Sequence, residues 1–216
     1  MRALYCAIAL LLCLVPGFSQ TKTPSSPLAI LFRFDGPTSE AGFQEMRREL
    51  RILMAPSNVQ PEWRDRATIS ASESFDRLVV VDFHGRCRME AGYVLSEEDQ
   101  PLGWTHVMDG EILPFADIQC DRVRASLYSA GWGSPNQHSD LTLGRALALV
   151  LAHELYHILA RTTSHAQNGI AKRTLSGAEL ASRRLAFTRA DLDLMKSPRE
   201  QAPAPLVAGR DLEFVP

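Results

Sequence analysis

The sequence predicts an α+β fold in which a mixed, twisted sheet packs on one buried helix. Between residues 28 and 118, short apolar runs rich in β-branched residues alternate with turn signals, and such runs are typical of strands. Residues 141–160 form a long run rich in Leu and Ala, which are among the best helix formers. Because this run is apolar almost all round, its helix belongs inside the domain. With 45% hydrophobic residues the chain can bury a core, and one domain over residues 28–196 is expected.

Residues 1–19 have the anatomy of a secretory signal peptide. A positive residue precedes an unbroken apolar run at 3–15, and Gly17 and Ser19 supply the small side chains that precede a cleavage site. We therefore expect a secreted or periplasmic protein, with residues 20–27 as a Ser/Thr/Pro-rich linker. The apolar run is too short to span a membrane comfortably, and no later segment is expected to span one. An uncleaved N-terminal anchor is the alternative.

The first elements of the predicted domain are a strand and a helix. Residues 28–34 are apolar and suit a buried strand, which ends at a turn over residues 35–37. Thr38 or Ser39 can then cap a helix that runs to about Met54, because the apolar side chains recur there at helical spacing.

The middle of the chain predicts the rest of the sheet. Residues 78–83 give the strongest strand signal, and three consecutive valines there indicate a central strand covered on both faces. Strands over 103–108 and 112–118 follow, and an Asp-Gly pair between them favours a hairpin turn. Residues 122–128 suit either a further strand or a short helix.

The predicted elements after the long helix are short. The long helix is expected to end near Arg161, and two further helices are predicted at 176–184 and 188–195. Residues 197–216 contain several prolines and are expected to form a flexible tail.

Charge excludes one class of partner. The formal net charge is −2, and the sequence contains no stripe of Lys or Arg, so nucleic-acid binding is not expected. Nothing in the sequence indicates the oligomeric state.

Two cysteines, Cys87 and Cys120, remain after removal of the signal peptide. In an oxidising compartment they can form one disulfide, which on the chain-entropy model contributes about 3–4 kcal/mol to stability. Two buried free thiols are the alternative.

The residues that indicate chemistry are His153, Glu154 and His157, in the pattern His-Glu-Leu-Tyr-His. On a helix, positions i and i+4 lie on one face, so both imidazoles can reach the same metal ion. Zinc held by these histidines and one further ligand keeps a coordination position open for water, and Glu154 is close enough to act as general base. A helix with two surface histidines is the alternative, but the apolar flanks argue against it, because buried polar groups need partners.

At these residues the sequence resembles the zincin metallopeptidases, and the segment from His153 to His165 resembles a divergent metzincin. In that family a third histidine shortly after the first two completes the zinc site, which implies His165 here. The chain departs from the family pattern at three positions. Metzincins have glycine at the position of Ala160 and their third histidine at the position of Thr163, and the methionine of their downstream turn is replaced here by Ala171. Ala160 predicts a slightly longer helix, which suits a later third ligand.

Glu179 is the alternative third ligand. In gluzincins a glutamate on a following helix completes the site. Glu179 lies 22 residues after His157 on a predicted helix.

The resemblance implies an exported zinc metallopeptidase that acts on a peptide or protein substrate. His153, His157 and His165 are the expected zinc ligands, and Glu154 is the expected catalytic base. The strand at 103–108, or its hairpin partner, is expected to bind extended substrate by strand addition. The alternative is a non-catalytic exported protein of the same fold that uses the metal for structure or binding.

Overall fold

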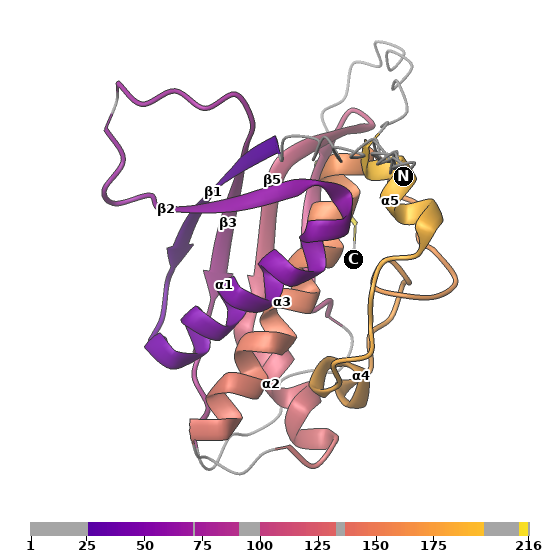
Figure 1. The fold of residues 1–216 in the computed structure, drawn as a ribbon. Coiled ribbons are helices and arrows are strands. Elements are labelled where there is room, and N and C mark those ends of the chain that lie inside the picture. Colours follow the sequence, from indigo (N-terminus) through magenta and orange to yellow (C-terminus); the bar gives the residue numbers. More distant parts are fainter. Residues whose placement is uncertain (1–25, 71, 91–99, 133–136, 197–211, 216) are drawn as a thin grey trace, which may run out of the picture.

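The computed structural model describes residues 26–70, 72–90, 100–132, 137–196 and 212–215 (Figure 1). The predicted signal peptide at 1–19 lies outside the described residues, as do most of the predicted linker at 20–27 and most of the predicted tail at 197–216.

The sheet has six strands in the order β2-β1-β3-β5-β4-β6. The strands are β1 (Ser26–Phe34), β2 (Val59–Asp65), β3 (Leu78–His84), β4 (Gly103–Met108), β5 (Glu111–Gln119) and β6 (Leu212–Val215). β2, β1, β3 and β5 are parallel, whereas β4 pairs antiparallel with β5 on one side and with β6 on the other. The sheet is therefore mixed, and the predicted α+β class is confirmed.

Several predicted elements are present in the structure, and they begin or turn at the residues that predicted them. Helix α1 (Glu40–Met54) starts where Ser39 accepts a hydrogen bond from the main-chain N–H of Gly42. The hairpin between β4 and β5 turns at Asp109 and Gly110, which both have positive φ, as a type I′ turn requires. The ambiguous segment before residue 130 is a helix, α2 (Cys120–Ser129).

Helix α3 (Gln137–Ala160) is the centre of the fold, and it starts four residues before the predicted run at 141–160. Figure 1 shows α1 and α3 crossing against the sheet, and they approach so closely that a Cβ on Gly144 would lie 2.2 Å from the main-chain oxygen of Gly42. No segment after the predicted signal peptide was expected to be long and apolar enough to cross a membrane. The segment Ser139–Ala160 meets both criteria. However, 89% of its most apolar window is buried inside the fold, as in a core helix.

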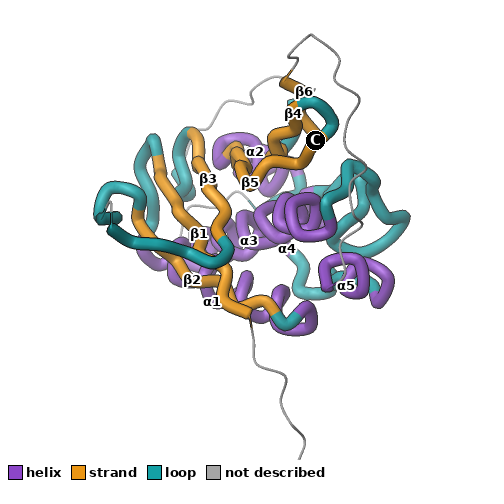
Figure 2. The backbone as a smooth tube through the Cα atoms, turned by 90° about the horizontal axis from the view of Figure 1, so that it is seen from above, coloured by secondary structure: helices purple, strands orange, loops and turns teal. Residues whose placement is uncertain are grey.

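Two expectations about the sheet are wrong. The central strand β3 is covered on one face only: Val79, Val81 and Phe83 are buried, whereas the side chains that alternate with them are partly exposed. Figure 2 shows α1 and α3 gathered on the same side of the sheet. Residues 212–215 of the predicted tail form β6, and the first two residues of β1 belong to the predicted linker.

Two helices follow α3, as predicted, but the first of them is shorter than predicted. The predicted helix at 176–184 is α4 (Gly177–Ala181), and the predicted helix at 188–195 is α5 (Arg189–Lys196). α4 lies beside α2 at one end of α3, and α5 lies at the other end (Figure 1).

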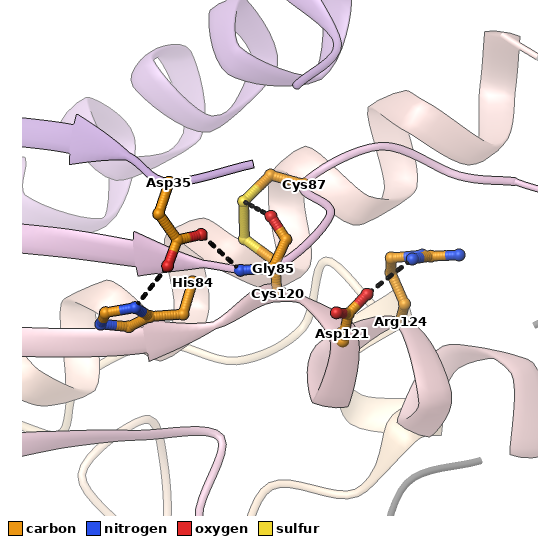
Figure 3. The surroundings of a disulfide bond; sticks show 7 residues. All are labelled: Asp35, His84, Gly85, Cys87, Cys120, Asp121 and Arg124. Atoms are coloured by element: carbon orange, nitrogen blue, oxygen red, sulfur yellow. Dashed lines mark hydrogen bonds and ion pairs between the residues drawn. A yellow bond between two sulfur atoms is a disulfide. The ribbon is translucent and has the colours of Figure 1, made fainter. Parts of the chain in front are cut away.

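Cys87 and Cys120 form a disulfide, which resolves the two alternatives left by the sequence. It links the segment after β3 to the first residue of α2 (Figure 3). Near the disulfide, Asp35 accepts hydrogen bonds from the N–H of Gly85 and from Nδ1 of His84. These hydrogen bonds hold the end of β3 next to the disulfide.

Removal of this disulfide is expected to destabilise the fold. The Cys87→Ser/Cys120→Ser variant opens a loop with a sequence separation of 33, and its free energy of unfolding should fall by about 3–4 kcal/mol. Denaturant unfolding of both proteins, without reductant, measures the difference. Equal midpoints, or free thiols in the native wild-type protein, would contradict the prediction.

Candidate metal centre

Helix α3 carries His153, Glu154 and His157 into the interior. Their exposed fractions are 5%, 1% and 0%, so none of the three is a surface residue. The interior position follows from the sequence, because Leu, Ala and Val surround the motif on every face of the helix. Polar groups buried this deeply are costly unless each has a partner.

The protonation of His153 and His157 follows from their hydrogen bonds. Nδ1 of His153 lies 2.8 Å from the main-chain oxygen of Ile170, and Nδ1 of His157 lies 2.7 Å from that of Thr162. A carbonyl oxygen can only accept, so each Nδ1 carries the proton and each Nε2 keeps a lone pair.

The two Nε2 atoms lie 3.1 Å apart. In these tautomers they cannot hydrogen-bond to each other, because both are acceptors. Two buried lone pairs that face the same point are suited to hold a cation between them. Carbonyl bonds to the far ring nitrogens are also the usual means by which proteins orient metal-binding imidazoles. The residues present therefore fit a zinc ion.

His165 joins this pair from the loop after α3. Its ring centroid lies 5.2 Å from that of His153 and 4.8 Å from that of His157. One ring nitrogen from each of the three histidines lies within 4.8 Å of the others, and no other such group of His, Cys, Asp or Glu occurs in the described part of the chain.

The end of α3 at Ala160 confirms the predicted end near Arg161, but the slight extension that Ala160 had suggested is absent. Arg161 takes a left-handed conformation with φ of 47°. The N–H of Thr162 then bonds to the carbonyl of His157, so the chain turns back at once. The loop is held by the hydrogen bond from Ala166 to the carbonyl of Ala171. This reversal, rather than a longer helix, brings His165 to the other two histidines.

Glu179 has different partners. Its carboxylate lies 2.5 Å from Nζ of Lys172 and accepts hydrogen bonds from the N–H and the hydroxyl of Ser176 in a capping box. The Lys172 ammonium and these bonds hold the pKa of Glu179 at about 2. In this structure the Glu179 carboxylate therefore caps the start of α4 and pairs with Lys172.

Glu154 is held by Thr105, a residue that the sequence analysis missed. The Thr105 hydroxyl donates to Oε2 of Glu154 at 2.9 Å and lies 3.2 Å from the main-chain oxygen of the same residue. The strand pattern contained the signal: Thr105 falls between Gly103 and Val107 on the inward face of the strand, where a hydroxyl needs a partner.

Burial governs the charges of this group. Burial lowers the pKa of His153 to about 4 and that of His157 to about 3, so both imidazoles are neutral near pH 7, the form that binds metals. Burial also raises the pKa of Glu154 to about 8, against the opposing hydrogen bond from Thr105.

A cavity of about 470 Å³ opens beside the group. His153 and Glu154 form part of its lining, together with residues that begin β4, residues of α2 and the segment before α4. A small molecule in this cavity would lie next to His153 and Glu154.

The strand expected to bind substrate, 103–108, is β4, and its outer edge is already paired. β6 runs antiparallel along it, with Thr105 opposite Val215 and Met108 opposite Leu212. Its hairpin partner β5 is paired on both sides, with β3 and β4. Strand addition at either strand would therefore require a change in the pairing seen here.

A search of protein-family models, of curated proteins and of solved structures finds no match to this chain.

Proposed function

We propose that this chain is an exported zinc metallopeptidase of zincin-like fold, which hydrolyses peptide bonds in peptide or protein substrates. One observation carries the proposal: the Nε2 atoms of two buried histidines lie 3.1 Å apart with their lone pairs toward one point, and a buried glutamate follows the first of them in the chain. His153, His157 and His165 would hold the ion. A purely structural metal site has no need of the glutamate.

Zinc, when bound, would supply a Lewis acid and lower the pKa of a coordinated water to about 7. Glu154, in its ionised form, which a cation beside it would favour, would accept the proton of the attacking water as the water oxygen bonds to the peptide carbon, and would deliver a proton to the leaving amine as the carbon–nitrogen bond breaks. Thr105 would keep the Glu154 carboxylate turned toward the cavity. The carbonyls of Ile170 and Thr162 would hold the two imidazoles in the ligating tautomer.

Metal analysis and a peptide library test the proposal. The protein should be expressed with residues 1–19 present, purified from the exported fraction, and analysed for bound metal by elemental mass spectrometry. We expect about one zinc per chain, an N-terminus near residue 20, and cleavage of peptides that a chelator abolishes and added zinc restores. A protein that binds no zinc would overturn the metal site, and an intact Met1 would overturn export.

A second function is favoured by the pairing of β6 with the outer edge of β4, since a strand-adding substrate would need that edge. In this case the chain would be a non-catalytic exported protein that uses zinc for structure or binding. Zinc at one per chain with no cleavage of any library peptide would favour this second function over the first.

A further inference from the structure

The cavity beside Glu154 carries positive charge on two of its walls. Arg122 reaches it from α2, and Arg173 reaches it from the segment between His165 and α4. Among the described residues that line the cavity, Glu154 is the only carboxylic acid, and that group belongs to the reaction proposed above. An anion that enters the cavity would therefore meet a lining with two arginines, of which Arg122 also interacts with another part of the protein.

Acids near these walls have other partners. Asp121 lies 2.7 Å from Arg124, and Glu179 lies 2.5 Å from Lys172. The side chain of Arg173 is exposed, and within the part of the chain that the structure describes no ion pair or hydrogen bond of its side chain is found. Its charge is thus available to a ligand.

Part of the remaining lining is apolar. Pro101, Leu102, Val150 and Leu175 contribute carbon surface to the lining. A cavity of about 470 Å³ with a few polar groups in an apolar wall has the size and character of a small-ligand site. It can take one amino-acid residue of a substrate, with its carbon atoms on the apolar wall and a charged end at the arginines.

Two of the segments that line the cavity are joined by a contact between main chains. A Cβ on Gly177 would lie 1.9 Å from the main-chain oxygen of Ser126, so α4 and α2 touch with no side chain between them. Ser126 lies on the same helix as Arg122, and Gly177 follows shortly after Arg173. The disulfide fixes the start of α2 (Figure 3). The main-chain segments that carry Arg122 and Arg173 are therefore held close together, and an ordered backbone of this kind lowers the cost of ordering a binding site.

We infer that this cavity recognises a carboxylate of the substrate through Arg173, with Arg122 as a second positive group. The inference deepens the proposed peptidase function, on which it rests. Arginine suits this role because its planar guanidinium can bind a carboxylate by two parallel hydrogen bonds. The carboxylate is either the side chain of an acidic residue or the terminal carboxylate of a peptide.

Peptide pairs distinguish these sources and test the inference by binding as well as by cleavage. One pair is an acetylated tetrapeptide amide with a central glutamate and its glutamine twin. The other is acetylated trialanine as the free acid and as the amide. Binding is measured by calorimetry on the Glu154→Gln variant, which should cleave the peptides at least about 100-fold more slowly, and kcat/KM is measured on the zinc-loaded wild-type protein.

We expect the carboxylate member of at least one pair to bind about 10-fold or more tightly than its neutral twin. Preference for glutamate identifies an acidic side chain, and preference for the free acid identifies a peptide terminus. Arg173→Gln, made in the same Glu154→Gln background, should reduce the ratio to below about 3-fold. Arg173→Lys should retain part of it, because the charge remains.

Arg189→Gln is the matched control, since Arg189 lies on α5 and pairs with Asp193 at the surface. It should leave the ratio unchanged. Equal binding within both pairs would overturn the inference, as would an equal loss of preference in Arg173→Gln and Arg189→Gln. Carboxylate-selective binding without cleavage of any peptide would contradict the peptidase function but not the carboxylate site. Cleavage of peptides without any preference for the carboxylate members would support the peptidase function and contradict the carboxylate site.

Discussion

Replacement of Glu154 by glutamine is expected to reduce peptide hydrolysis by about 10²–10⁴-fold, the usual contribution of a general base. The amide has the size and shape of the carboxylate but cannot accept the proton of the attacking water. It can still accept the hydrogen bond from Thr105, so the local structure should be kept. Zinc content should stay at about one per chain, because the three histidines are unchanged.

Three measurements separate this result from simple misfolding: kcat and KM on a cleaved library peptide, zinc content, and the thermal unfolding midpoint. The matched control is Glu111→Gln, the same chemical change at an exposed position of β5, which should leave all three unchanged. A Glu154→Gln protein that keeps full activity would eliminate Glu154 as the base. One that loses both zinc and its fold would instead show that the carboxylate has a structural role.

Replacement of His165 by alanine is expected to cause the largest loss of zinc affinity that does not alter the motif helix. Three protein ligands would become two, and the loss should exceed the about 10–100-fold that removal of an outer partner of a metal ligand costs. Glu179→Ala should leave zinc affinity almost unchanged, because its carboxylate bonds to Lys172 and Ser176.

Competition with a zinc-binding dye of known affinity measures both variants. His106→Ala serves as the control, since this histidine bonds to Asp117 on the face of the sheet that the helices do not cover. If Glu179→Ala strips the metal and His165→Ala does not, the assignment of the third ligand must be exchanged. If neither variant changes affinity, the third ligand is another residue.

Elements with a local signal could be predicted from the sequence. Ser39 marks the start of α1 because a capping hydroxyl acts within one turn, and the Asp-Gly pair fixes the hairpin because only its own backbone angles matter. Strand β2 (Val59–Asp65) was not predicted. It contains Pro61 and several charged residues, and a strand at the edge of a sheet tolerates both because it pairs on one side only.

The site also contains residues that the sequence could group and residues that it could not. His153, Glu154 and His157 are related by helical geometry alone, so their spacing suffices to group them. His165 reaches them through the turn at Arg161, and Thr105 reaches Glu154 across a sequence separation of 49 residues. Such contacts depend on how the sheet packs on α3. The resemblance to known peptidases, and not the pattern alone, pointed to His165.

The pairing of β6 with β4 has a consequence for how any extended ligand could enter. A strand that belongs to the same chain is present at its partner at an effective concentration on the order of millimolar, whatever the protein concentration. A free peptide that adds to β4 competes with this tethered strand and binds more weakly by the corresponding factor. A ligand that enters the cavity beside Glu154 displaces none of the backbone pairs of β4 and β6 and escapes that competition.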